Sequence, residues 1–110
     1  MKLSEAIRKG CKIARRQTGG ELFEWNEDGK LLAACVLGAA ILGSGFDVNY
    51  NSISSKHVAS LREMFPELKK LTKSPRQNTD EELQDILVHL NDDYDMPRYQ
   101  IARWLERKGL

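Results

Sequence analysis

The longest apolar stretch of the chain, residues 31–43, limits the available folds more than any other feature. It reads Leu-Leu-Ala-Ala-Cys-Val-Leu-Gly-Ala-Ala-Ile-Leu-Gly and contains no charged residue. A membrane-spanning helix needs about 20 such residues, so this stretch predicts an element buried in a protein core. Its periodicity does not separate helix from strand. The alanines and the length nevertheless favour a central buried helix over residues 31–42.

The rest of the chain is suited to surround such an element. The 110 residues are enough for one domain spanning 1–110, and 41% of them are hydrophobic and 30% charged, as is typical of a globular protein. Lys and Arg exceed Asp and Glu by one, 17 against 16. The chain as a whole therefore has no strong attraction to nucleic acid or to an anionic membrane.

Apolar residues at the spacing of an amphipathic helix predict four further helices, over residues 3–16, 55–72, 80–91 and 97–108. Ser4 is the expected N-cap of the first. Thr79-Asp-Glu-Glu82 has the pattern of a capping box at the start of the third, and Pro97 fits the first turn of the last. The sequence thus predicts a mainly all-α fold, a single compact bundle of about five helices around a central apolar helix. The expected core residues are Ile7, Cys11, Cys35, Leu37, Ile41, Val58, Leu61, Phe65, Leu83, Ile86, Leu87, Leu90, Ile101, Trp104 and Leu105.

Residues 21–30 allow two interpretations. Leu22, Phe23 and Trp25 give the segment weak strand character, and residues 26–29 form a turn pattern with Gly at its last position. The segment is either a short hairpin or an apolar loop over the core, and the loop is favoured.

The two cysteines, Cys11 and Cys35, are too few for a disulfide scaffold and lie among apolar residues. We expect them to be small buried hydrophobic residues of a protein in a reducing compartment. No signal-peptide pattern is visible in residues 1–16, and the expected location is the cytoplasm, away from membranes.

The sequence excludes several chemistries. His57 and His89 are far apart and have no metal-ligand spacing, and no phosphate-binding glycine loop or nucleophile elbow occurs. Asn91, Asp93 and Asp95 match three positions of an EF-hand loop, but Met96 and Ala102 occupy positions that need Gly and Glu. These acids are instead expected to satisfy turn amides and to cap the last helix. We therefore expect no metal, no cofactor and no enzymatic activity. A small hydrolase with a pocket around either histidine is the remote alternative.

Charge is distributed unevenly along the chain. Residues 1–16, 56–76 and 98–108 are basic, whereas residues 80–95 carry seven acids and no Lys or Arg. Oppositely charged helices packed side by side are the favoured explanation, and a basic face for phosphate groups is the alternative. The last two predicted helices also have the outline of a helix-turn-helix, although the first of the pair is acidic. The final helix is expected to present Arg98, Tyr99, Gln100, Arg103 and Arg107 outward. The candidate nucleic-acid-binding residues are Lys9, Lys12, Arg15, Arg16, Arg98, Arg103 and Arg107.

Three segments resemble small uncharacterised proteins of phages and bacteria. They are Cys35-Val-Leu-Gly-Ala-Ala40, Val88-His-Leu-Asn-Asp-Asp93 and Gln100-Ile-Ala-Arg-Trp-Leu-Glu106. The similar proteins, a domain of unknown function, carry a C-x-L-G-A segment and an L-N-D turn before an I-A-x-W-L-E helix. The resemblance covers residues 30–106, and Met96 and Pro97 stand where those proteins often have Trp and a Ser cap. It implies a shared fold and supplies no activity, cofactor or catalytic residue.

Two functional hypotheses follow. The leading one is a non-enzymatic accessory protein of phage or mobile-element type that binds another protein through Phe23 and Trp25, with a homodimer as one form of that interaction. The alternative is a nucleic-acid-binding regulatory protein that uses a basic helix face. Exposure of Trp25 would favour the first hypothesis, and its complete burial would weaken it.

Overall fold

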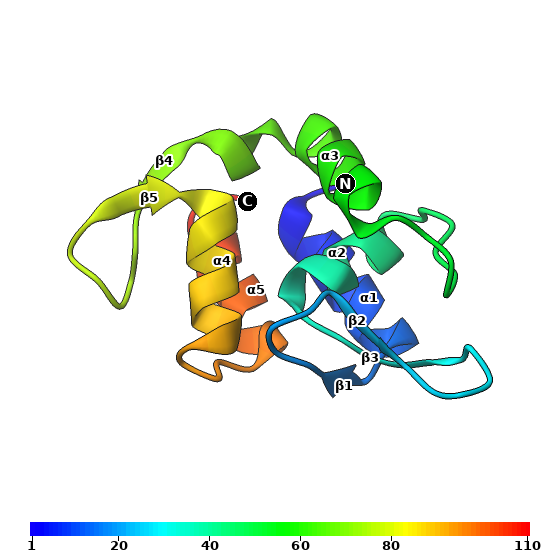
Figure 1. Ribbon diagram of the computed structural model, residues 1–110. Coiled ribbons are helices and arrows are strands. Elements are labelled where there is room, and N and C mark those ends of the chain that lie inside the picture. The colour runs from blue at the N-terminus through cyan, green and yellow to red at the C-terminus, as the bar shows by residue number, and fades with distance from the viewer.

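The computed structural model describes all residues from 1 to 110 (Figure 1). Five α-helices, one 3-10 helix and five short strands follow one another along the chain, and the strands form two small sheets. The expectation of an all-α bundle is therefore wrong, because the fold mixes helices with strands. The helices are α1 (Leu3–Ile13), α2 (Val36–Gly43), α3 (Ser54–Met64), η1 (Pro66–Lys69), α4 (Leu83–Asp92) and α5 (Arg98–Arg107).

A three-stranded sheet has the order β1 (Arg16–Gln17), β3 (Leu31–Ala34), β2 (Phe23–Trp25). β2 and β3 are antiparallel and β1 is parallel to β3. Residues 21–30 are thus a hairpin, and the favoured loop interpretation is wrong. The side chain of Asn26 closes the turn, since its Oδ1 accepts hydrogen bonds from the backbone N–H groups of Asp28 and Lys30, each at 2.9 Å.

The apolar run of residues 31–43 is divided between a strand and a helix. Its first four residues form β3, whose backbone groups find partners on both β1 and β2. Cys35 then caps α2, and its Sγ accepts a hydrogen bond from the N–H of Gly38 at 3.4 Å. The predicted helix over 31–42 is therefore wrong in its first part. Paired backbone groups on both sides outweigh the helical preference of the two alanines.

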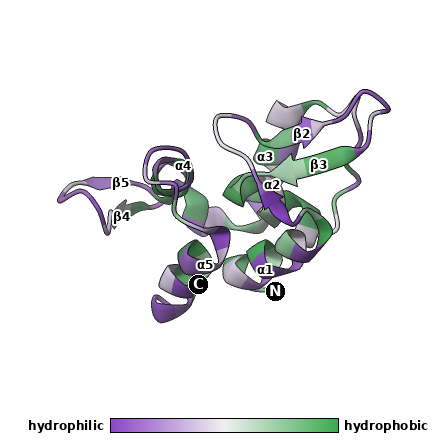
Figure 2. Ribbon diagram, turned by 90° about the horizontal axis from the view of Figure 1, so that it is seen from below, coloured by the Kyte–Doolittle hydropathy of each residue, from purple (hydrophilic) through white to green (hydrophobic).

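A second hairpin interrupts two of the predicted helices. α3 ends at Met64 before Pro66, and the chain continues through η1 into β4 (Leu71–Lys73). β4 pairs with β5 (Asp80–Glu82), so the expected capping box at residues 79–82 belongs to a strand and α4 begins at Leu83. The helices predicted over 55–72 and 80–91 are therefore too long. Figure 1 shows this hairpin projecting beside α4, and Figure 2 shows its largely hydrophilic tip.

Helices α1 and α2 pack with their backbones in contact. Gly10 of α1 faces Ala39, and Gly43 of α2 faces Ala6, so that a Cβ at either glycine would overlap the facing carbonyl group. Helical glycine costs about 0.5–1 kcal/mol relative to alanine, and this close approach is the feature that requires it. The first helix ends at residue 13 rather than 16.

The expected N-cap role of Ser4 is wrong. The residue lies inside α1 rather than at its start, and its hydroxyl donates to the backbone oxygen of Leu110 at 3.2 Å. This contact joins the two ends of the chain, because the start of α1 lies beside the end of α5.

One cluster of 22 buried residues forms the core and includes most of the expected residues. Cys11, Val58 and Trp104 are only partly buried at its edge. Helix α2 supplies the centre of the core, and Figure 2 shows the apolar character of this helix and of β3 beside it. No helix has the length and apolar character needed to cross a membrane.

A buried polar network joins α4 and α5 to the sheet. Asn91 is 2% exposed, and its Oδ1 accepts hydrogen bonds from Gln17 Nε2 at 2.9 Å and from the N–H of Val36 at 3.0 Å. Its Nδ2 donates to the backbone oxygen of Thr18 and to Asp92 Oδ1, each at 2.8 Å. Every hydrogen-bonding position of the amide is therefore occupied. The network fixes α4 relative to α2 and β1.

Candidate functional site

The outer face of α5 forms one side of a groove of about 300 Å³. The apolar residues Ile101, Ala102 and Leu105 lie on the buried face of the helix, which packs antiparallel to α1. The opposite face of α5 is exposed to solvent. The groove is lined by Pro75, Arg76, Met96, Gln100, Arg103, Trp104 and Arg107.

The loop between β4 and β5 supplies the other side of this α5 groove. The buried hydroxyl of Ser74 accepts hydrogen bonds from the N–H groups of Arg76 and Gln77, each at 3.3 Å, and so defines the turn. The guanidinium carbon of Arg76 then lies 5.6 Å from the centre of the Tyr94 ring, within the range of a cation–π contact. The loop thereby carries a cation to the groove from a segment distant in sequence.

The guanidinium groups of Arg76, Arg103 and Arg107 form neither a salt bridge nor a side-chain hydrogen bond. The carboxylate nearest in sequence is that of Glu106. It is bound instead to Arg8 of α1 through two contacts, Nε–Oε2 at 2.9 Å and Nη2–Oε1 at 2.8 Å. The hydrogen bond from Arg8 lowers the pKa of Glu106 and keeps it ionised. The α5 groove therefore keeps three cations free for an anionic ligand.

Trp104 gives the groove an aromatic wall. Its ring is partly buried against the core, and the ammonium group of Lys108 lies 5.1 Å from the ring centre. Tyr94 and Tyr99 lie nearby in sequence with 41% and 52% of their surface exposed. Trp104 is flanked on the outer face of α5 by Arg103, Arg107 and Lys108.

The structure divides the predicted basic residues into separate groups. Arg103 and Arg107 line the α5 groove, whereas Arg15 lines a different hollow, beside Pro97 and Tyr99. Lys9 and Lys12 are exposed on α1. On β1, the side chain of Arg16 lies 3.5 Å from the Glu24 carboxylate.

Arg98 does not face outward as expected. It is 5% exposed, and its Nη1 donates to the backbone oxygens of Ala14 at 2.7 Å and Ala34 at 3.1 Å. Its Nη2 donates to the backbone oxygen of Arg15 at 2.6 Å. Three carbonyl groups thus occupy this guanidinium, which joins the start of α5 to the ends of α1 and β3 and is closed to a ligand.

The candidate protein-binding pair, Phe23 and Trp25, is largely engaged inside the molecule. Phe23 is 8% exposed and belongs to the core, and Trp25 is partly buried against it. The Trp25 ring lies 6.1 Å from that of Tyr50 in an edge-to-face contact and 5.9 Å from that of Phe23. Trp25 is thus neither fully exposed nor fully buried, and it offers a partner only part of its surface.

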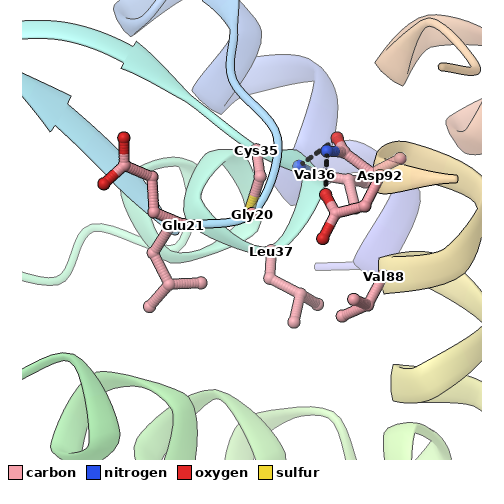
Figure 3. A pocket seen from close by; sticks show the side chains of 9 residues that line it. Gly20, Glu21, Cys35, Val36, Leu37, Val88 and Asp92 are labelled. Atoms are coloured by element: carbon pink, nitrogen blue, oxygen red, sulfur yellow. Dashed lines mark hydrogen bonds between the residues drawn. The ribbon is translucent and has the colours of Figure 1, made fainter.

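A smaller cavity of about 180 Å³ lies between α2, α4 and residues 20–22. Figure 3 shows Leu37 and Val88 lining it, while the carboxylate of Glu21 points away from them. Burial raises the pKa of the Cys35 thiol beside it, so that the thiol is protonated at neutral pH. No histidine lines the cavity, and the amide of Asn91 is fully used by its own hydrogen bonds. This cavity therefore has an apolar lining without an activated nucleophile.

Neither His57 nor His89 lines any of the four cavities of the molecule. His89 lies on α4 between two carboxylates, with Nδ1 2.7 Å from Asp93 and Nε2 3.5 Å from Glu81. The idea that Asp93 or Asp95 caps the last helix is wrong, because α5 begins after Pro97 without a side-chain cap. No group of three or more His, Cys, Asp or Glu side chains is arranged to hold a metal ion.

No protein-family model, no curated protein and no solved structure matches the chain. The function of the protein is therefore inferred from the residues of this chain. Arg76, which lines the α5 groove, is not among the predicted site residues. Arg76 is separated from α5 by more than 20 residues and reaches it only because β4 and β5 pair. The Ser74-Pro75 turn pattern before it was the only local signal.

Proposed function

We propose that the protein binds nucleic acid in the α5 groove, and that Arg76, Arg103 and Arg107 contact the phosphate backbone. The observation that carries the proposal is that these three guanidinium groups surround one groove without a carboxylate partner. Guanidinium is planar and binds phosphate oxygens through two parallel hydrogen bonds. All three arginines are exposed and so are accessible to such a ligand.

Two further groove residues favour nucleic acid over a simple acidic peptide. Trp104 offers an aromatic surface, and Gln100 offers an amide that can both donate to and accept from a base edge. Nucleic acid can use both groups together with the arginines, since it combines phosphates with bases that stack and form hydrogen bonds. The near-neutral total charge is compatible with this function because no Asp or Glu lines the groove.

Binding of a protein through Phe23 and Trp25 stays a prediction. The partial burial of Trp25 supports it less than the unpaired arginines support a nucleic-acid ligand. The same holds for the accessory role suggested by the resemblance to phage and bacterial proteins. A cytoplasmic location accords with the proposal, because nucleic acid is present there.

The experiment is fluorescence anisotropy of labelled mixed-sequence oligonucleotides, between about 50 and 200 mM salt. The test variant is R76A/R103A/R107A, and its matched control is K30A/K56A/K70A, which removes the same charge from exposed sites elsewhere. The wild type should lose affinity steeply with salt, since each neutralised phosphate releases counterions. The arginine variant should bind at least about tenfold more weakly with a shallower salt slope, because it loses up to three phosphate contacts.

Two results would overturn the proposal. One is absence of wild-type binding at the lowest salt concentration. The other is equal loss of affinity in both variants, which would assign binding to general charge rather than to the groove.

A further inference from the structure

The lining of the α5 groove distinguishes single-stranded from double-stranded nucleic acid, an inference that rests on the proposed function. The decisive feature is that an aromatic side chain lines the groove together with the three arginines. Trp104 lines the same cavity as Arg76, Arg103 and Arg107. A base can stack on an indole ring only when it is free of its partner strand, because a paired base is covered on both faces by its neighbours. Phosphate contacts alone would not require this ring.

The surroundings of α5 are unfavourable for a duplex. A recognition helix enters the major groove with its N-terminal residues on the base edges, but Arg98 at the start of α5 is buried and bound to three carbonyl groups. Pro75 and Arg76 also flank the helix, so it does not project freely. These contacts leave a channel beside the helix rather than a protruding reading surface.

The acidic turn before α5 acts in the same direction. Asp93 and Asp95 adjoin Tyr94 in the chain and are both exposed. A ligand whose phosphates extended over this turn would meet like charges, which repel. A single strand can follow the line of arginines and avoid them.

We infer that the α5 groove binds single-stranded nucleic acid, with one base stacked on Trp104 and the phosphates on either side held by Arg76, Arg103 and Arg107. Tyr94 and Tyr99 do not line this groove, so Trp104 is its single aromatic ring. Sequence preference is weak, because every base has a face that can stack.

The test measures binding of one short labelled oligonucleotide as a single strand and as its duplex. The W25F variant leaves Trp104 as the sole tryptophan, and its fluorescence should be quenched on binding the single strand. The wild type should bind the single strand at least about tenfold more tightly than the duplex. Trp104→Leu should weaken single-strand binding about 5- to 150-fold, the range for loss of one stacked base. Trp104→Tyr should restore most of the affinity, which a merely structural role of the indole would not predict.

The outcomes separate this inference from the function on which it rests. Equal affinity for the two forms, or unchanged single-strand binding by Trp104→Leu, overturns the stacking inference. If the stacking inference fails but R76A/R103A/R107A still binds duplex more weakly than the wild type does, the proposed nucleic-acid binding is retained. If the wild type binds neither the single strand nor the duplex, the proposed function and the stacking inference are both wrong. Circular dichroism of Trp104→Leu, with W25L as the matched control, verifies that the variants are folded.

Discussion

Arg8 on α1 holds the carboxylate of Glu106 on α5 through two hydrogen bonds of 2.9 and 2.8 Å. Both side chains of the pair are more than 40% exposed, so water screens the attraction and its direct contribution to stability is small. Its position is more important than its strength. Glu106 is the only acid within α5, and Arg8 directs it toward α1 rather than toward Arg103 and Arg107.

Arg8→Ala should therefore weaken nucleic-acid binding although Arg8 does not line the groove. The freed carboxylate can turn toward Arg103 and compete with phosphate for its guanidinium, so we expect a loss of about fivefold in affinity. Lys9→Ala is the control, because it removes the same charge from α1 without releasing Glu106. Anisotropy titrations of R8A, K9A and R8A/E106Q measure the effect. The double variant should regain wild-type affinity, and equal losses in R8A and K9A would contradict this role of the pair.

Asn91→Ala should be strongly destabilising. It removes the side-chain amide that joins β1, α2 and α4. The N–H of Val36 and the backbone oxygen of Thr18 then lose their hydrogen-bond partner. Each buried polar group left unpaired costs about 1–3 kcal/mol, so we expect a loss of at least about 2 kcal/mol in the free energy of unfolding. Urea denaturation measures it. Asn78→Ala, at an exposed position without side-chain hydrogen bonds, should change stability by less than about 0.5 kcal/mol. Similar values for the two variants would refute the importance of the network.

Gly10→Ala tests the close packing of α1 on α2. In an uncrowded helix this substitution stabilises by about 1 kcal/mol, because alanine has the higher helix propensity. Here the new Cβ would overlap the carbonyl group of Ala39, and overpacking of this kind costs about 1–3 kcal/mol or more. The sign of the change in melting temperature is therefore diagnostic. Gly19→Ala meets only ordinary contacts, the nearest being 3.6 Å from Asp92 Oδ1, and should be close to neutral. If Gly10→Ala instead raised the melting temperature, α1 and α2 would have to lie farther apart than the contact of Gly10 with Ala39 indicates.

His89 should titrate above its usual range. The hydrogen bond to Asp93 is the largest cause that raises its pKa from 6.5, and the charges of Glu81, Asp93 and Asp85 add to it. Because the folded state binds the proton more tightly, the stabilisation is complete below about pH 6.5 and is lost as the pH rises through the folded pKa. An exposed pair of this type contributes about 0.3–0.5 kcal/mol. NMR titration of the ring should give a midpoint above 6.5, and a lower one in Asp93→Asn. A wild-type midpoint at or below 6.5 would contradict the contact.

The sequence predicted the parts of the fold that depend on local periodicity. The buried faces of α4 and α5 follow from apolar residues at helical spacing, and Leu87, Leu90 and Ile101 are fully buried as expected. The apolar run was also placed correctly in the core. Its division into β3 and α2 could not be predicted, because the strand depends on pairing with β1 and β2 on either side. The same reason applies to residues 80–82, where a partner strand overrides a good capping pattern.

The candidate site was predictable only in its helical part. Arg103 and Arg107 were recognised from their spacing on the last helix, whereas Arg98 was misplaced because its neighbours across the fold are three backbone carbonyl groups. Trp104 was predicted as a core residue, and it instead lies at the edge of the core and faces the groove. Arg76 joins the site only through the β4–β5 hairpin. Charge counts along the chain do not reveal which cations are paired.

The two tryptophans allow binding in the α5 groove to be distinguished from binding at the β2–β3 hairpin in a single spectrum. Trp104 lies in the α5 groove and Trp25 on the hairpin at residues 23–34, so their indole N–H signals in a ¹H–¹⁵N spectrum report on the two candidate surfaces separately. If single-stranded nucleic acid binds in the α5 groove, titration with a single-stranded oligonucleotide should shift the Trp104 signal and leave the Trp25 signal in place. A shift of Trp25 alone, or no shift of either signal, would contradict it.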